Sequence, residues 1–340
     1  MYALARSLLF ALDAERAHGL TLAGLRLGHR LGLLGRSAAA QPAQAVELMG
    51  LTFANRIGLA AGFDKNATCV DAMGALGFGF IEVGTLTPRS QAGNPRPRIF
   101  RLPRARAVIN RMGFPNEGVA AAAVRLRRRR YNGVCGVNIG KNAATPLEQA
   151  TGDYVMALTT VYEFADYVTI NISSPNTQGL RQLQQGEQLR PLLQALLATR
   201  AELAERVGWK VPLVVKLSPD LAADDLAATA QVIRELALDG VIATNTTVDR
   251  TRVAGLPGAE RPGGLSGAPL RERAAAVVRD LRALLGPDMP LIGVGGIAAA
   301  ADATAMLAAG ADLVQVYTGL IYRGPALVRE LIAATRHNQP

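Results

Sequence analysis

Short apolar runs alternate with longer segments rich in alanine and leucine from about residue 57 to residue 317. The short runs cover four to six residues and are rich in Val, Ile and Leu, as in buried parallel strands, whereas the longer segments have helical periodicity. Eight such units in succession predict an α/β fold of the (β/α)8 TIM-barrel type rather than an open doubly wound sheet. The predicted strands span residues 57–61, 80–84, 134–139, 167–171, 213–217, 240–244, 291–294 and 313–317, and segments 221–238 and 299–309 are examples of the predicted helices.

Two amphipathic helices are predicted ahead of the barrel, within residues 3–35, each with a leucine stripe surrounded by arginines. Such a basic pair can lie on an anionic membrane surface or pack on the main domain, and the pattern leaves both open. No apolar stretch reaches the roughly 18 residues of a membrane span, and the run 7–12 is too short for a secretory signal. The stripes consist of Leu4, Leu8 and Leu12, and of Leu20, Leu27, Leu31 and Leu34.

The boundary between these helices and the barrel is predicted at residues 37–44, whose small and polar residues suit a linker. We therefore expect an N-terminal helical domain over residues 1–40 and the barrel over residues 45–337. Two short apolar runs around a glycine, residues 46–48 and 51–53, predict a hairpin that closes the bottom of the barrel.

Composition excludes several classes of site from the barrel. The only histidines of the 340 residues are His18, His29 and His337, so no Ser-His-Asp hydrolase, histidine-ligated zinc site or histidine acid–base enzyme is expected there. No metal site is predicted. The two cysteines, Cys69 and Cys135, rule out a disulfide framework and are expected to be small core residues.

The formal net charge is +10, and only four of the 37 basic residues are lysines. The arginine run at 127–130 has no aromatic residues interleaved for base stacking, so no nucleic-acid surface is predicted. Three of the four lysines follow apolar runs directly, where a compact ammonium rather than a planar guanidinium is indicated.

The active site of such a barrel lies at the carboxyl ends of the strands, and these ends are polar here. Amide side chains both donate and accept hydrogen bonds, so several of them suit a flat heterocycle with alternating carbonyl and N–H groups. A single asparagine more often marks a turn, but five at successive strand ends weaken that alternative. The five are Asn138, Asn171, Asn176, Asn245 and, in a long loop after the second strand, Asn110.

Glycines follow the seventh and eighth strands, where these barrels bind phosphate on bare backbone N–H groups. Gly295 and Gly296 follow the seventh strand, and Thr318 and Gly319 follow the eighth. The sequence contains neither a P-loop nor a dinucleotide fingerprint, so a mononucleotide such as FMN is favoured over NAD.

Lys216, at the end of the fifth strand, has two credible uses. It could form a Schiff base, as in an aldolase without flavin, or it could stay charged beside a flavin ring. Two further alternatives are an RNA-modifying flavin barrel, which would use the positive charge, and a non-catalytic membrane-surface protein resting on residues 3–35 alone.

Taken together, the strand-end motifs resemble the dihydroorotate dehydrogenases of the membrane-associated, quinone-dependent class 2. The resemblance runs from Tyr2 to about Leu331, through AAGFDKN, NRMGF, INISSPNT, ATNTT, GGLSG and GVGGI. It implies an FMN across the top of the barrel and oxidation of dihydroorotate to orotate in pyrimidine synthesis. Class 1 enzymes have cysteine in place of Ser174 and lack the N-terminal helices, so both features favour class 2.

The resemblance also implies residue roles. Ser174 would be the catalytic base, Lys216 would offset charge on the reduced flavin, and Thr177 could help the proton leave. His18 and Arg101 would form the quinone site. FMN would be bound by Ala61, Gly62, Phe63, Asp64, Lys65, Thr85, Asn138, Asn171, Lys216, Thr244, Gly267, Gly296, Tyr317 and Thr318, and the pyrimidine by Lys65, Asn110, Arg111, Met112, Gly113, Phe114, Asn171, Asn176, Asn245 and Thr246.

Several expectations about partners follow from the same resemblance. The N-terminal helices would bind an anionic membrane surface and admit a membrane quinone, which places the protein peripherally on the cytoplasmic side of the inner membrane. We expect a monomer that binds no nucleic acid. The segment 175–187, which contains two glycines, could be a lid that excludes water.

Overall fold

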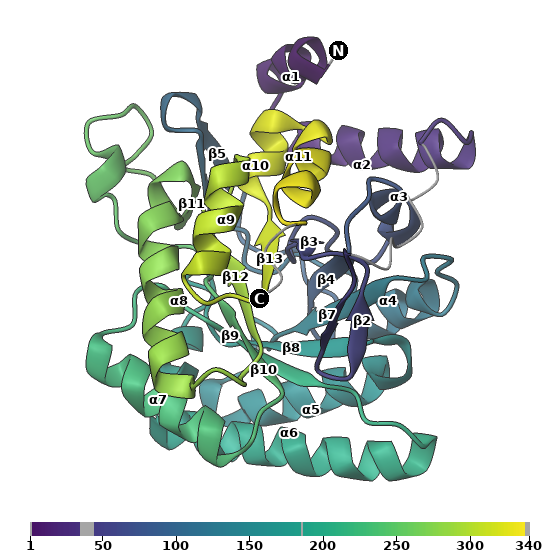
Figure 1. Cartoon of the computed structure of the whole chain (residues 1–340), viewed down its shortest axis with the longest axis vertical. Helices are drawn as coiled ribbons and strands as arrows, with labels where there is room; N and C mark the ends of the chain where they lie inside the picture. The colour runs from purple at the N-terminus through teal and green to yellow at the C-terminus, as the bar shows by residue number, and fades with distance from the viewer. Residues whose placement is uncertain (1, 35–43, 185, 337–340) are drawn as a thin grey trace.

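A computed structural model of the chain describes residues 2–34, 44–184 and 186–336. Its centre is a closed barrel of eight parallel strands surrounded by helices (Figure 1), which confirms the predicted fold. The apolar runs form strands because one face packs on the helices and the other fills the barrel interior. The barrel strands are β3 (Ile57–Leu59), β4 (Phe80–Leu86), β7 (Val134–Ile139), β8 (Tyr167–Asn171), β9 (Leu213–Leu217), β10 (Gly240–Ala243), β12 (Leu291–Val294) and β13 (Leu313–Val316).

The helices that cover the barrel pack on it through Ala, Leu and Val. The two predicted helices given as examples are α7 and α9, each a few residues shorter than the pattern indicated. The helices from α3 onward are α3 (Val70–Gly74), α4 (Val119–Leu126), α5 (Ala150–Val161), α6 (Gly186–Val207), α7 (Ala223–Glu235), α8 (Arg271–Leu285), α9 (Ala300–Ala308), α10 (Thr318–Arg323) and α11 (Ala326–Ala334).

The predicted hairpin is present as β1 (Val46–Leu48) and β2 (Leu51–Phe53), paired antiparallel. Phe53 is fully buried, and its ring meets that of Phe80 edge-on at 5.2 Å between centroids. The hairpin therefore closes the end of the barrel at which the strands begin, as expected. The predicted linker falls largely outside the described residues.

A second sheet lies at the opposite end of the barrel and was not predicted. It is antiparallel and consists of β5 (Ile99–Leu102), β6 (Ala107–Asn110) and β11 (Gly264–Gly267). Asn110 is thus the last residue of a strand, not a loop residue, and Gly264 is its partner in the ladder. These four-residue runs lack a clear period, and β6 pairs with a strand distant in sequence, so the local pattern could not reveal them.

The N-terminal residues form α1 (Tyr2–Ala11) and α2 (Ala14–Arg30), which lie at one end of the molecule beside α10 and α11 (Figure 1). Asp13 caps α2, since its carboxylate accepts hydrogen bonds from two backbone N–H groups at the start of the helix. α1 is held on α10 by Tyr2, whose hydroxyl donates to the carbonyl of Ile321 at 2.6 Å.

Most of the predicted leucine stripes face outward rather than onto the barrel. Leu4 is 76% exposed and Leu31 is 63% exposed, whereas Ala17 is buried and Leu22 and Leu25 pack on the core. The helices therefore dock through other residues and leave an apolar surface uncovered. No helix within the described residues is long and apolar enough to cross a bilayer.

Candidate active site

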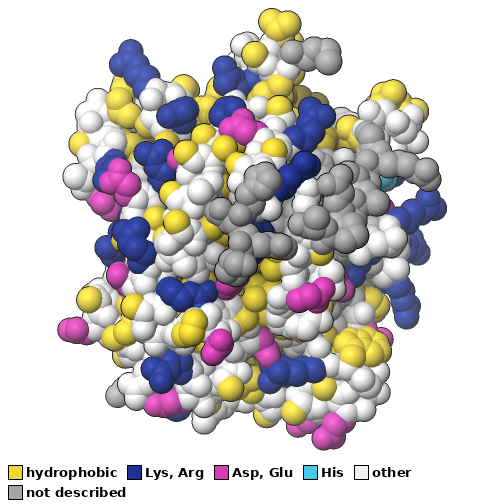
Figure 2. Space-filling model, viewed as in Figure 1, with side chains coloured by type: hydrophobic (Ala, Val, Ile, Leu, Met, Phe, Trp, Pro, Cys, Tyr) yellow, Lys and Arg dark blue, Asp and Glu magenta, His cyan; other side chains and the backbone are white. Residues whose placement is uncertain are grey.

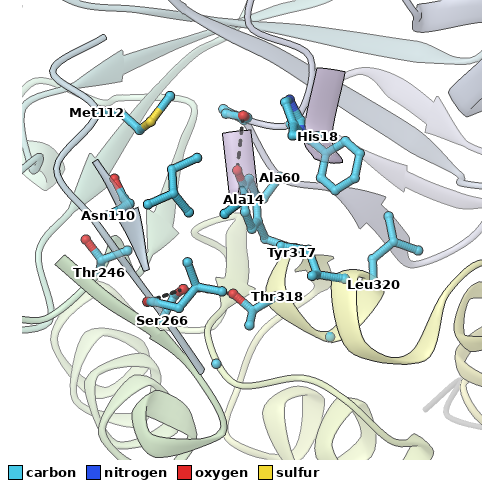
Figure 3. Close-up of a pocket in the computed structure, with 18 of the residues that line it drawn as sticks. Ala14, His18, Ala60, Asn110, Met112, Thr246, Ser266, Tyr317, Thr318 and Leu320 are labelled. Atoms are coloured by element: carbon cyan, nitrogen blue, oxygen red, sulfur yellow. Dashed lines mark hydrogen bonds between the residues drawn. The ribbon is translucent and has the colours of Figure 1, made fainter. Parts of the chain in front are cut away.

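A cavity of about 700 Å³ opens at the carboxyl ends of the barrel strands and continues to α1 and α2. Its size lies within the range of small-molecule and cofactor sites. Figure 3 shows Asn110, Thr246 and Ser266 on one side of the cavity and His18 of α2 on the other. The site is therefore built jointly by the barrel, the second sheet and the N-terminal helices.

Most of the predicted site residues meet at this cavity. Four lie outside its wall: Asp64, Arg111, Asn138 and Thr177. The predicted residues that line it are Ala61, Gly62, Phe63, Lys65, Thr85, Asn171, Ser174, Lys216, Thr244, Gly267, Gly296, Tyr317 and Thr318, together with Asn110, Met112, Gly113, Phe114, Asn176, Asn245, Thr246, His18 and Arg101.

Two of the four outlying residues have local structural contacts. The buried Asp64 carboxylate accepts hydrogen bonds from the backbone N–H groups of Thr68 and Cys69, at 2.9 and 2.6 Å, and so folds the turn before α3. The Arg111 guanidinium donates to the carbonyl of Pro97 at 2.9 Å. The Asp64 carboxylate is therefore occupied by the turn, whereas two of the three Arg111 nitrogens point to Pro97.

Asn138 organises the cavity wall from behind. Its fully buried amide donates to Glu82 at 2.8 Å, and its Oδ1 accepts from Thr85 at 2.5 Å and from Asn171 at 3.1 Å. Asn171 Oδ1 in turn accepts from the amide of Asn245 at 3.3 Å. Each amide is thus held in one orientation by its neighbours.

Asn110 and Asn176 come from distant parts of the chain and face each other. Asn176 Nδ2 donates to Asn110 Oδ1 at 3.1 Å. Asn94, in the loop before β5, donates to the carbonyls of Asn176 and Arg111, at 3.1 and 3.0 Å. The amides at this side of the cavity are therefore held by a loop outside the barrel.

Glycines line the cavity at the end of β11 and after β12, and Thr318 lines it after β13. At Gly296, φ is +75°, and a Cβ atom there would lie 2.5 Å from the Cα of Arg271. At Gly267, φ is +96°, and a Cβ would lie 2.4 Å from a carbonyl oxygen. Only glycine fits both places, and the nearby Thr318 and Ser266 hydroxyls are 2.8 Å apart. These features suit an anionic phosphate group.

Lys216 reaches the cavity from β9 and is buried. Within the described residues its ammonium has no hydrogen-bond or ion-pair partner, and burial lowers its pKa while the charge of Glu82 opposes that shift. The fully buried Glu82 accepts hydrogen bonds from Asn138, Tyr167 and Gln315. The Lys216 ammonium and the Glu82 carboxylate therefore lie together in the barrel interior, and the ammonium remains available to a ligand.

Ser174 and Ser173 are adjacent but differ in their surroundings. The Ser173 hydroxyl is engaged with Asn171 Oδ1 at 3.1 Å and the amide of Asn245 at 2.9 Å. Ser174 lines the cavity, and within the described residues its Oγ makes one hydrogen bond, which it accepts from the backbone N–H of Asn176 at 3.2 Å. Thr177 is buried nearby in sequence, and its hydroxyl has no partner among the described residues.

Lys65 is the second lysine of the cavity, and its ammonium donates to the carbonyl of Gly62 at 2.7 Å. Burial lowers its pKa to about 8, and the carboxylates of Glu15 and Asp64 counteract part of that shift. At neutral pH it is therefore mostly protonated and can meet a carboxylate ligand.

The end of the cavity near α1 and α2 is apolar, with two polar side chains in it. Burial lowers the pKa of His18 to about 3, so its ring is neutral, and it packs edge-on against Phe63. The Arg101 guanidinium lies over the ring of Phe10 at 4.6 Å and donates to the carbonyls of Phe10 and Leu12. This end suits an apolar ligand with a polar head.

Arg181 holds part of the predicted lid, the 3-10 helix at Leu180–Gln184, against the site. Its guanidinium donates to the carbonyls of Ser173 and Thr246, at 3.2 and 2.9 Å, and pairs with Asp220 at 2.8 Å. The segment is thus packed over the strand ends in this structure.

Glu82 and Arg181 were both missed from the sequence. A carboxylate in the middle of an apolar strand is an available signal for Glu82, because a buried charge needs partners. Arginine is so frequent in this chain that Arg181 had no distinguishing signal.

Comparisons with known proteins show the family of this chain. Residues 43–337 match the family model described as dihydroorotate dehydrogenase. The chain is 56% identical over 340 residues to the dihydroorotate dehydrogenase (quinone) of Stenotrophomonas maltophilia strain R551-3, which covers all of this chain and 97% of that protein. It is also 56% identical to the enzyme of the same name from Chromobacterium violaceum, over 98% of this chain and 97% of the relative.

Solved structures give the same result. A crystal structure of DHODH from Eimeria tenella in complex with ferulenol superposes with a TM-score of 0.87 at 38% identity, over 94% of this chain and 90% of that one. A ligand-free structure from the same organism gives a TM-score of 0.86 at 39% identity, over 93% of each chain. From its sequence, its barrel and its strand-end site, the chain belongs to the dihydroorotate dehydrogenase family, in the quinone-dependent class 2.

Proposed function

We propose that the protein catalyses the FMN-dependent oxidation of (S)-dihydroorotate to orotate in the de novo synthesis of UMP, with a quinone as electron acceptor. The observation that carries this proposal is one cavity that joins three features: the strand-end amides, the glycine-lined end and the apolar end between α1 and α2. Family membership supports the same reaction.

FMN fits the residues at the strand ends. Gly267, Gly296 and Thr318 would bind its phosphate, since all three line the cavity and phosphate in such barrels binds to backbone N–H groups beyond the last two strands. Lys216 and the amide of Asn171 would face the ring system. When bound, FMN supplies a hydride acceptor for the substrate and passes electrons on to the quinone.

The pyrimidine would bind above the ring, between the asparagines and Lys65. Lys65 gives a counter-charge for the orotate carboxylate, while Asn110, Asn176 and Asn245 pair with the ring carbonyl and N–H groups. Ser174 would remove the proton from the ring carbon next to the carbonyl as the neighbouring carbon loses a hydride. Because serine is a weak base, the proton needs an outlet, and we assign it to the unpartnered hydroxyl of Thr177 with water.

The other predicted roles complete the proposal. Lys216 would stabilise negative charge that develops beside it, and closure of the segment 175–187 would exclude water. His18 and Arg101 would bind the quinone head at the apolar end of the cavity. We assign residues 1–40 to a membrane and quinone domain and residues 45–337 to the catalytic barrel.

We further propose a peripheral location on the cytoplasmic side of the inner membrane, as a monomer. Figure 2 shows hydrophobic side chains on the outer tips of α1 and α2, with basic side chains nearby. The exposed leucines would insert into the bilayer, and the arginines beside them would bind anionic headgroups.

Membrane binding gives a prediction. Leu4→Glu is expected to lower binding to vesicles that contain phosphatidylglycerol by about tenfold or more, because one buried leucine contributes roughly 1.5–3 kcal/mol. Cosedimentation measures the effect. Met156→Glu, which changes a 56% exposed residue on α5, is the matched control and should bind as the unmodified protein does. Equal binding of the two variants would contradict a role for the leucine surface.

An anaerobic titration tests the proposed activity. The purified protein is expected to be yellow, to lose its visible absorbance when dihydroorotate is added, and to regain it when a soluble quinone follows. A colourless protein trapped on substrate by borohydride would favour a Schiff-base aldolase instead. A bound flavin that dihydroorotate does not reduce would favour the RNA-modifying flavin barrel.

A further inference from the structure

Glu15, in the first turn of α2, makes a charged contact with the loop before β5 that the proposed activity does not use. Its two carboxylate oxygens accept from Arg98 Nη2 at 2.6 Å and Arg98 Nε at 3.1 Å, and Arg96 Nη2 adds a third bond at 3.0 Å. The Arg98 side chain is only 5% exposed and that of Arg96 is 73% exposed. The two-point contact with Arg98 is therefore the one shielded from solvent.

Arg98 connects this contact to a loop. Its Nη1 donates to the carbonyls of Ala92 and Asn94, at 2.6 and 2.9 Å. Every nitrogen of the guanidinium is thus engaged, on one side with α2 and on the other with the turn at residues 92–94. Loss of Glu15 would leave a buried, uncompensated charge at the centre of that turn.

Asn94 carries the connection to the cavity. Its amide donates to the carbonyls of Asn176 and Arg111, and its backbone N–H donates to the carbonyl of Met112 at 2.9 Å. Asn176 is hydrogen bonded to Asn110. The turn that Arg98 orders is therefore the support for two segments that the proposed function assigns to the pyrimidine.

We propose that Glu15 is a positioning residue of the pyrimidine site, which it orders from the N-terminal helices through Arg98 and Asn94. The inference rests on the proposed function. Under this proposal the substrate site is ordered only when α2 is docked on the loop before β5. α2 then contributes to the oxidation of dihydroorotate as well as to quinone access.

The charge of Glu15 also acts on Lys65. Burial lowers the pKa of Lys65, Glu15 is the largest of the charges that oppose this shift, Asp64 opposes it too, and Arg98 adds to it. His18, the other titratable group near Lys65, is neutral. Without Glu15 the pKa of Lys65 would fall below about 8, and the ammonium would be lost at a lower pH.

The test compares orotate binding to Glu15→Gln and to the unmodified holoenzyme, both with FMN bound and in detergent. Orotate affinity is read from the change in flavin absorbance between pH 6 and pH 9. Glu15→Gln is expected to bind orotate about tenfold more weakly at pH 7, as for loss of a charged hydrogen bond. As the pH is raised, its orotate affinity should also begin to fall at a lower pH than that of the unmodified protein, because Lys65 loses its proton earlier. A purely structural role of Glu15 would not cause this shift.

Two further variants make the result decisive. Glu47→Gln makes the same chemical change on β1, at the other end of the barrel, and should bind orotate normally. Asn94→Ala breaks the connection without changing a charge, so affinity should fall while its pH dependence stays unchanged. The proposal is overturned if Glu15→Gln matches Glu47→Gln or, should Glu15→Gln not retain FMN, if Asn94→Ala binds orotate normally. An unmodified protein that shows no flavin response to orotate would instead refute the proposed function.

Discussion

Replacement of Ser174 by Ala is expected to slow flavin reduction by dihydroorotate by about 10²- to 10⁴-fold, the usual contribution of a positioned general base. FMN should remain bound, because the residues assigned to the cofactor are untouched. Anaerobic stopped-flow absorbance measures this step apart from reoxidation by quinone. Reduction at the normal rate would refute the assignment of the base.

The neighbouring serine is the matched control for this experiment. The Ser173 hydroxyl already bonds to Asn171 and Asn245, so it is not available as a base. Ser173→Ala should cost about one hydrogen bond, on the order of 1 kcal/mol or about fivefold in rate. A larger loss for Ser173→Ala than for Ser174→Ala would reverse the two roles.

The sequence was sufficient to predict the barrel and most residues at its mouth, for a local reason. A buried parallel strand is encoded by its own apolar residues, and in a closed barrel its carboxyl end lies at a fixed place. Thr85, Asn171 and Lys216 follow or end such runs, and all three line the cavity. Once the strands are recognised, the barrel fold itself brings these three side chains to the same cavity.

Other parts of the site depend on contacts between distant segments, which no local pattern contains. The strand that ends at Asn110 pairs with one more than 150 positions away. The leucine stripes can be seen in the sequence. Their outward orientation cannot, nor can the inward orientation of Ala17. The contact of Glu15 with Arg98 exists only because α2 docks where it does, and the arginines of this chain are too many to single one out.

Replacement of Lys216 by Met should have the second large effect. The variant keeps the length of the side chain but removes a buried ammonium that no other side chain of the described residues pairs with. Flavin reduction by dihydroorotate is expected to fall by about 10²- to 10³-fold, as for loss of one preorganised electrostatic group. The midpoint potential of the bound flavin should become more negative, because no cation then offsets the charge of its reduced form. Rapid kinetics and redox titration measure the two effects.

A second variant, in which the charge of Glu82 is also removed, distinguishes this role of Lys216 from a structural one. Lys216→Met leaves the buried Glu82 carboxylate without its balancing cation, so the thermal midpoint of unfolding should also fall. In the double variant Lys216→Met/Glu82→Gln the interior is neutral again. The new amide oxygen can still accept from Asn138, while its NH2 group can donate to the Tyr167 hydroxyl oxygen and, after a flip of the Gln315 amide, to Gln315 Oε1. The double variant should regain much of the thermal midpoint and none of the reduction rate, because the ammonium acts on the flavin while the carboxylate balances the ammonium. Recovery of the rate together with the midpoint would mean that Lys216 serves only to neutralise Glu82.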